Sequence, residues 1–214
     1  MTICGVFKMI YVDPKFYVPD DPTATVTKIL ASESLFRVGI AVGLASIVLF
    51  LLVVYVLYKL FKSVDKDLAM LMVILVVVSI PIGLNFNEFA PILLLKGSGS
   101  HSAFQATQLQ TLAMTFLELQ RNADLIGQIF WGLWLFPLGL LVIKSGFIPK
   151  ALGIALIAGG IGYILNSLTF VLFPDYKFLT YFGSFIGFVS EILFILWLLI
   201  KGVNNKQSFT STAR

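Results

Sequence analysis

Long uncharged runs are the feature that most limits how this chain can fold. Residues 38–58, 68–87, 125–143 and 151–174 contain no Asp, Glu, Lys or Arg. A helix that crosses the hydrocarbon core of a bilayer, about 30 Å thick, needs about 20 mostly apolar residues. Because lipid offers the backbone no hydrogen-bond partners, a helix is the form such a run can take there. The runs therefore predict an all-α membrane protein.

The predicted architecture is a polytopic helical bundle with five transmembrane helices. The expected spans cover about 35–61, 68–95, 122–144, 148–173 and 178–200. Residues 102–121 place apolar side chains on one face, which predicts an amphipathic helix at the outer rim, either separate from the third span or continuous with it. The N-terminal segment 1–34 should also lie outside, with a short helix that begins at Pro22 after an Asp21 cap. We expect one membrane domain over residues 1–214.

The composition agrees with this class and excludes others. The chain is 58% hydrophobic and 12% charged, whereas about a quarter of the residues in a soluble domain are charged. Disorder is excluded by the high hydrophobic content, and a disulfide scaffold by the single cysteine, Cys4. The net charge of +4 reflects loop orientation in such a protein, so no nucleic-acid partner is expected. Membrane lipids are the expected partners.

Basic residues are unevenly distributed among the predicted loops. The loop 59–67, the hairpin 144–150 and the C-terminal tail hold most of the lysines and arginines outside the N-terminal segment. The opposite loops hold fewer, namely Lys96, Arg121 and Lys177. Basic loops stay in the cytoplasm, which predicts a cytoplasmic C-terminus and an outer N-terminal segment.

Five motifs follow one another along nearly the whole chain. They are DPTAT at 21–25, ILASESLFRVG at 29–39, LIGQIFWGL at 125–133, SGFIP with LG at 145–149 and 152–153, and FPDY at 173–176. In this order they resemble the bacterial domain-of-unknown-function family 4386. The resemblance implies a multi-pass protein of the bacterial inner membrane with no assigned activity.

The chain departs from this family at two places. Family members typically have a complete helix before the Asp-Pro motif and six spans, whereas here only the apolar stretch 3–12 corresponds to it. We therefore expect a truncated or late-start form that lacks most of the first helix. Trp134 stands where many relatives have histidine, so an activity that needs this histidine would be absent.

Polar side chains inside the predicted spans are the candidate ligand-binding residues, because burying them in a membrane is costly. They are Arg37, Asn85, Glu88, Arg121, Asp124, Gln128, Asn166 and Glu191. Helical rise puts Glu88, Gln128 and Asn166 roughly 8–11 Å inside the outer ends of their helices. This predicts one polar cluster in the outer half. Glu191 should lie deeper, about 20 Å in.

Two interpretations of these residues stay open. In the functional one, Arg37 or Arg121 pairs with Asp124 or Glu88 in an outward-facing pocket, and Glu191 is a deeper proton or cation site. In the structural one, the groups satisfy one another, hold the bundle together and cap the outer ends of the helices.

Three functions follow from these interpretations. The first is binding or transport of a small or lipidic ligand through the outer polar cavity. The second is a structural or interaction subunit of a membrane complex. The third is an intramembrane enzyme that uses carboxylates, which is disfavoured because no nucleophile motif or metal-ligand motif occurs. We therefore expect no catalytic residue, metal site or cofactor.

Small residues at helical spacing offer a packing face on two spans. The pairs are Gly39 with Gly43 and Gly183 with Gly187. Such pairs let two helices approach closely. They fit either packing inside one bundle or contact with a second copy or a membrane partner.

Overall fold

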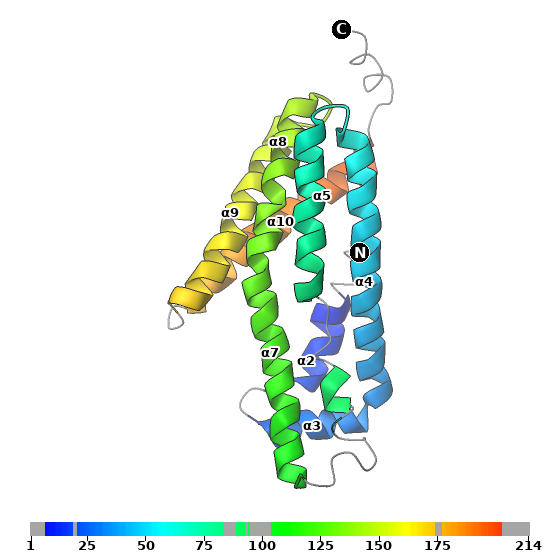
Figure 1. The fold of residues 1–214 in the computed structure, drawn as a ribbon, viewed down its shortest axis with the longest axis vertical. Coiled ribbons are helices and arrows are strands. Elements are labelled where there is room, and N and C mark those ends of the chain that lie inside the picture. The colour runs from blue at the N-terminus through cyan, green and yellow to red at the C-terminus, as the bar shows by residue number, and fades with distance from the viewer. Residues whose placement is uncertain are drawn as a thin grey trace. The chain divides into compact units, whose positions relative to one another are not determined.

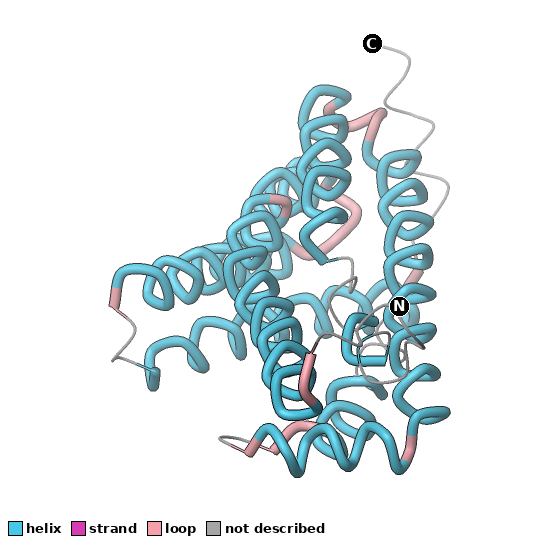
Figure 2. The backbone as a smooth tube through the Cα atoms, turned by 60° about the horizontal axis from the view of Figure 1, so that its bottom comes forward, coloured by secondary structure: helices cyan, strands magenta, loops and turns pink. Residues whose placement is uncertain are grey.

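A computed structural model describes residues 7–18, 21–83, 89–92, 94, 104–173 and 177–202. These residues are helical apart from short connections and include no strand (Figures 1 and 2). The elements are η1 (Lys8–Val12), α2 (Asp13–Phe16), α3 (Pro22–Ala31), α4 (Glu33–Phe61), α5 (Lys66–Gly83), α7 (Ala106–Leu133), α8 (Leu135–Ser145), α9 (Lys150–Leu172) and α10 (Lys177–Lys201). The all-α prediction is confirmed for the described part of the chain.

Four helical segments within the described residues are long and apolar enough to cross a membrane. They are Glu33–Phe61, Ala106–Ser145, Lys150–Leu172 and Gly183–Lys201. The chain is therefore a membrane protein. The remaining predicted span, 68–95, begins with α5 but runs through residues 84–88, which lie outside the described residues. The total of five spans stays a prediction.

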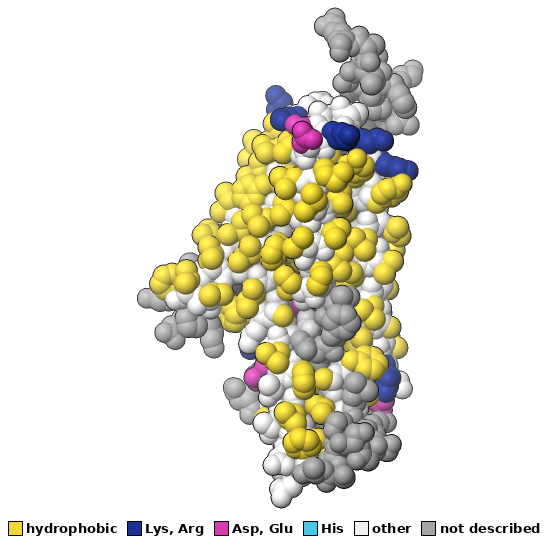
Figure 3. All heavy atoms as spheres, viewed as in Figure 1, with side chains coloured by type: hydrophobic (Ala, Val, Ile, Leu, Met, Phe, Trp, Pro, Cys, Tyr) yellow, Lys and Arg dark blue, Asp and Glu magenta, His cyan; other side chains and the backbone are white. Residues whose placement is uncertain are grey.

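Helix α4 carries a broad apolar surface suited to lipid. Val48, Leu52 and Val56 are 58%, 56% and 61% exposed, and their spacing of four residues places them on one face. Figure 3 shows hydrophobic side chains over much of the visible surface of the helices. In water such a surface would be costly, whereas acyl chains cover it.

The chain divides into two compact units. Unit 1 comprises Met1–Phe50 and Gly83–Asp124, and unit 2 comprises Leu51–Ile82 and Leu125–Arg214. The boundary falls inside α4 and α7, so both helices contribute residues to each unit. That residues 1–214 form one membrane domain stays a prediction.

Unit 1 builds a small core from its short helices. Helix α3 begins as predicted, because Asp21 Oδ1 accepts a 2.8 Å hydrogen bond from the backbone N–H of Ala24 and Pro22 follows it. The predicted amphipathic helix 102–121 is continuous with the third span, one of the two arrangements expected, since α7 runs without a break from Ala106 to Leu133. The core side chains are Val12, Phe16, Ile29, Phe36, Ile40 and Ile92.

Unit 2 depends on close contacts between helices. A Cβ added to Gly162 on α9 would lie 2.5 Å from the carbonyl oxygen of Gly183 on α10, so only glycine fits there. A Cβ on Gly187 would lie 2.5 Å from the ring of Tyr163. Gly183 and Gly187 thus pack against α9 within the chain. Gly146 ends α8 at φ +71°, a conformation that glycine adopts without strain.

Candidate functional site

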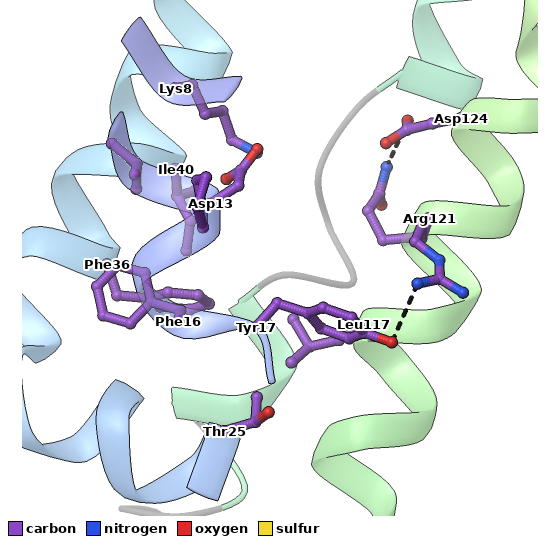
Figure 4. Close-up of a pocket in the computed structure, with 14 residues that line it drawn as sticks. Lys8, Asp13, Phe16, Tyr17, Thr25, Phe36, Ile40, Leu117, Arg121 and Asp124 are labelled. Atoms are coloured by element: carbon purple, nitrogen blue, oxygen red, sulfur yellow. Dashed lines mark hydrogen bonds and ion pairs between the residues drawn. The ribbon is translucent and has the colours of Figure 1, made fainter. Parts of the chain in front are cut away.

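Unit 1 contains a cavity of about 450 Å³ between its short N-terminal helices, α4 and α7 (Figure 4). Its size is typical of ligand pockets, which range from about 300 to 1,000 Å³. The lining residues are Lys8, Val12, Asp13, Pro14, Phe16, Tyr17, Thr25, Phe36, Gly39, Ile40, Leu117, Gln120, Arg121 and Asp124. The cavity therefore combines an apolar wall with charged side chains.

The apolar wall belongs to the core of unit 1. Phe16 and Phe36 meet edge to face with ring centroids 5.1 Å apart, and both are buried. Gly39 on α4 allows Val12 to approach closely, because an added Cβ would lie 2.6 Å from Val12 Cγ1. An apolar group that enters the cavity would replace water against this wall, which is favourable.

A buried threonine fixes the segment that follows α2. Thr25 Oγ1 accepts a 3.0 Å hydrogen bond from the backbone N–H of Val18 and donates a 3.3 Å bond to the Val18 carbonyl oxygen. Thr25 itself is fully buried. The hydroxyl thus satisfies two backbone groups outside a helix and holds the neighbouring Tyr17 beside the cavity.

Arg121 and Tyr17 meet at the polar side of the cavity. One Arg121 Nη donates a 3.0 Å hydrogen bond to the Tyr17 hydroxyl, and Arg121 Cζ lies 5.3 Å from the ring centroid. In Figure 4 the Tyr17 side chain extends toward α7, where Arg121 lies. This pair joins the residue that follows α2 to α7.

The other charged lining residues have partners close by in sequence. Lys8 Nζ forms an ion pair with Asp13 Oδ1 at 3.1 Å. Gln120 Nε2 donates a 3.0 Å hydrogen bond to Asp124 Oδ1. Arg121 and Asp13 are exposed, so the charged side of the cavity reaches the surface of unit 1.

Of the predicted site residues in unit 1 that the structure describes, Arg121 and Asp124 line this cavity. The predicted pairing of these two is wrong, because Arg121 turns to Tyr17 whereas Gln120 bonds Asp124. Arg37 does not line the cavity and pairs with Glu33 on its own helix, with 2.7 Å between Nε and Oε1.

Two predicted site residues, Asn85 and Glu88, lie outside the described residues. A pairing of either arginine with Glu88 stays a prediction for the same reason.

Several cavity residues were not predicted from the sequence. They are Lys8, Asp13, Tyr17, Thr25 and Gln120. One signal could have revealed part of this set, because Asp13-Pro14 repeats the Asp21-Pro22 pattern that begins α3. Helix α2 indeed starts at Asp13 with proline in its first turn.

Gln128 and Asn166 meet inside unit 2. Asn166 Nδ2 donates hydrogen bonds to Gln128 Oε1 on α7 and, at 2.6 Å, to Ser184 Oγ on α10. Ser184 in turn donates a 3.1 Å bond to Gln128 Oε1. Asn166 is 1% exposed, and its Oδ1 has no hydrogen-bond partner in the described structure. These three amide and hydroxyl groups connect three helices.

Glu191 forms a separate pair in unit 2. Its Oε2 accepts a 3.0 Å hydrogen bond from the Tyr163 hydroxyl on α9. Tyr163 is buried and Glu191 is half-buried. The carboxylate thus faces a neighbouring helix. Among the described residues, no group of three or more His, Cys, Asp and Glu side chains could hold a metal ion.

Comparison with known proteins gives a family and one relative. Residues 1–202 match the model of the family described as "Domain of unknown function (DUF4386)". The chain is 43% identical over 77 residues to an uncharacterized protein of Archaeoglobus fulgidus. The matched stretch is 36% of this chain and 44% of that relative, so less than half of the relative is covered. No solved structure matches the chain.

Proposed function

We propose that this protein, which belongs to the DUF4386 family, binds or moves a small amphiphile or lipid. The unit 1 cavity holds the apolar tail of this ligand. The family description names no activity, so the proposal stands on geometry. The observation that carries it is the cavity of about 450 Å³ that joins a buried apolar wall to an exposed charged side.

An amphiphile fits this arrangement better than a purely polar solute. Burying one methylene group stabilises a complex by about 0.8 kcal/mol, and the wall formed by Phe16, Phe36 and Ile40 offers apolar surface for this purpose. A polar solute would have to lose its water against the same wall without gaining hydrogen bonds. The exposed Arg121 and Asp13 let the polar end of an amphiphile stay hydrated.

We propose a structural role for the polar groups of unit 2. Gln128 and Asn166 are hydrogen-bonded to each other, and Glu191 is bonded to Tyr163. Groups that bond one another across helices stabilise their packing, and the donors used in these bonds are not available to a ligand. Ligand binding is therefore assigned to unit 1 alone.

The proposed location is the bacterial cell membrane, with the C-terminus in the cytoplasm. The basic loops near 59–67 and 144–150 support this orientation. Within unit 2, Lys144 Nζ lies 2.7 Å from Asp65 Oδ2, so the two loops meet. Their meeting is consistent with both lying on one side of the membrane.

Photolabelling tests the binding proposal. The full chain in phosphatidylcholine nanodiscs would be irradiated with a diazirine fatty acid, and the labelled peptides mapped by mass spectrometry. We expect labels on the cavity-lining segments of η1, α2 and α7, and competition by excess unlabelled fatty acid. A label spread evenly over lipid-facing helices, without competition, would overturn the proposal.

Two tryptophan variants on α7 sharpen this experiment. Leu117 lines the cavity, so Leu117→Trp should fill part of it and lower the specific labelling several-fold. Leu119 lies on the same helix, is 51% exposed and does not line the cavity. Leu119→Trp should therefore label like the wild type. Equal labelling of the two variants, both with unchanged thermal midpoints, would also count against the cavity.

A further inference from the structure

We infer that the polar end of this amphiphile is an anion, a phosphate or a carboxylate, and that Arg121 binds it. The inference rests on the proposed function and deepens it by naming the chemical class of the ligand. It follows from the contacts of the charged side chains around the cavity.

Among the described lining residues the cations are Lys8 and Arg121, and Arg121 differs from Lys8 in having a neutral partner. Lys8 pairs with Asp13, and Arg37, on α4 outside the lining, pairs with Glu33. Among the described residues, no carboxylate lies within ion-pair distance of Arg121, whose hydrogen-bond partner is the Tyr17 hydroxyl. A guanidinium has five N–H donors, so most donors of Arg121 are available to a ligand.

The chemistry of the guanidinium favours an oxyanion. Its planar set of donors binds phosphate or carboxylate through two parallel hydrogen bonds, which are stronger than bonds between neutral groups. The Tyr17 hydroxyl and ring hold the guanidinium from one side. The arginine is therefore oriented before the ligand arrives, which lowers the entropic cost of binding.

The position of Arg121 connects the anion to the apolar wall. Leu117 and Arg121 are four residues apart on α7, so they share a face of the helix one turn from each other. Both line the cavity, as do Phe16 and Phe36. Figure 4 shows Leu117 beside the Tyr17 ring and Arg121 further along the same helix. A chain placed against Leu117 would therefore carry its polar end to Arg121.

Asp124 lies on the same side of the cavity and opposes an anion there. It is three residues after Arg121 on α7, and its carboxylate accepts a hydrogen bond from Gln120. Its negative charge should weaken the binding of an anion without preventing it, because the site is partly exposed to solvent. Removing this charge should consequently strengthen binding, whereas removing the charge of Arg121 should weaken it.

Competition against the photolabel in the same nanodiscs tests the inference. The competitors share one chain length and differ in their polar end: dodecyl phosphate, dodecanoate, dodecanol and dodecyltrimethylammonium, with inorganic phosphate added alone. In the wild type we expect the two anionic amphiphiles to compete at concentrations about tenfold lower than dodecanol, the difference that one charge-assisted contact produces. Inorganic phosphate should not compete.

Variants assign the preference to Arg121. Arg121→Gln should remove the tenfold preference and leave competition by dodecanol unchanged, and Arg121→Lys should restore part of it. Asp124→Asn should increase the preference. Lys28→Gln removes an exposed cation of α3 that does not line the cavity, so it should behave like the wild type. The thermal midpoint of each variant shows that the chain is folded.

The outcomes separate the two proposals. If Arg121→Gln retains the preference for anions, or if dodecanol competes as well as dodecyl phosphate in the wild type, the inference about Arg121 is wrong and the cavity proposal stands. If inorganic phosphate competes as strongly as dodecyl phosphate, the site binds a free anion and the amphiphile assignment is overturned. If no amphiphile competes in the wild type, the proposed function fails and the inference fails with it.

Discussion

The Tyr163 hydroxyl on α9 donates a 3.0 Å hydrogen bond to Glu191 Oε2 on α10. The bond forms where the two helices approach closely, because the Tyr163 ring packs against Gly187. A side chain at position 187 would push the ring away. The small residue and the polar pair therefore depend on each other, and together they connect the last two helices of unit 2.

Tyr163→Phe should destabilise the protein by about 1–3 kcal/mol, because it removes the donor and leaves the Glu191 carboxylate without this partner. Thermal or denaturant unfolding of the detergent-solubilised chain measures the change. Tyr55→Phe is the matched control, since Tyr55 is 54% exposed and its hydroxyl makes no hydrogen bond to the described residues. A Tyr163→Phe variant as stable as the control would show that the bond contributes nothing.

A double-mutant cycle at Tyr163 and Glu191 separates the bond from other effects. Glutamine still offers an oxygen to the Tyr163 hydroxyl, so Glu191→Gln alone should cost less than Tyr163→Phe. Glu191→Met removes the acceptor, so a coupling energy of about 0.5–3 kcal/mol is expected between Glu191→Met and Tyr163→Phe. Strict additivity would mean that the two side chains act independently.

Gly162→Ala should destabilise the pairing of α9 with α10. The added methyl would lie 2.5 Å from the Gly183 carbonyl oxygen, which belongs to a helix backbone and cannot rotate away. Such overpacking costs typically about 1–3 kcal/mol. Unfolding measurements should show this loss, whereas Ala158→Val, on the exposed side of the same helix, should change little. Equal stability of the two variants would refute the close contact.

Local sequence signals predicted the helices well. The Asp21-Pro22 pair begins α3 as expected, and α4 covers Glu33–Phe61 where a span over 35–61 was predicted. These features depend on capping and on apolar runs, which neighbouring residues determine. The depth argument also placed Gln128 and Asn166 at a similar level, and they are hydrogen-bonded.

The cavity could not be predicted in the same way. Its lining residues come from η1, α2 with the following Tyr17, α3, α4 and α7. No sequence pattern within one helix predicts that these elements meet. The N-terminal stretch gave a weak signal because it is apolar but too short to span. The pairing of Arg121 with Tyr17 joins residues more than a hundred positions apart. The segment next to Tyr17 is itself held by hydrogen bonds between Thr25 and Val18.

Acid should weaken the contact between Lys144 and Asp65. The Lys144 ammonium, followed by the backbone N–H of Leu68, hydrogen-bonds the carboxylate and lowers the pKa of Asp65 below its usual 3.8. A lowered pKa in the folded state means that the contact stabilises the fold above pH 3.8. This contribution is lost as the pH falls through the folded-state pKa.

Asp65→Asn tests this pH dependence. Asparagine can still cap α5 through Leu68 but cannot form the ion pair. The thermal midpoint of the wild type should exceed that of the variant by a constant small amount above about pH 5, and the difference should shrink below about pH 4. Asp67→Asn, two residues further along the chain, is the matched control, because it leaves the ion pair of Lys144 with Asp65 intact and should keep the part of the pH dependence that comes from that pair. A difference that grows on acidification would have the wrong sign.

Thr25→Val should damage both the fold of unit 1 and its cavity. Valine has nearly the shape of threonine but cannot bond the N–H and carbonyl of Val18. The Val18 carbonyl keeps its 3.3 Å hydrogen bond from the Asp21 N–H, whereas the partly buried Val18 N–H loses its partner at a cost of about 1–3 kcal/mol. Tyr17 lies next to Val18, so photolabelling of the cavity should fall as well. Thr27→Val is the matched control on α3, because Thr27 is exposed and its hydroxyl bonds only the Thr23 carbonyl of the same helix. If Thr25→Val matches this control in stability and in labelling, the hydroxyl does not hold Tyr17 at the cavity.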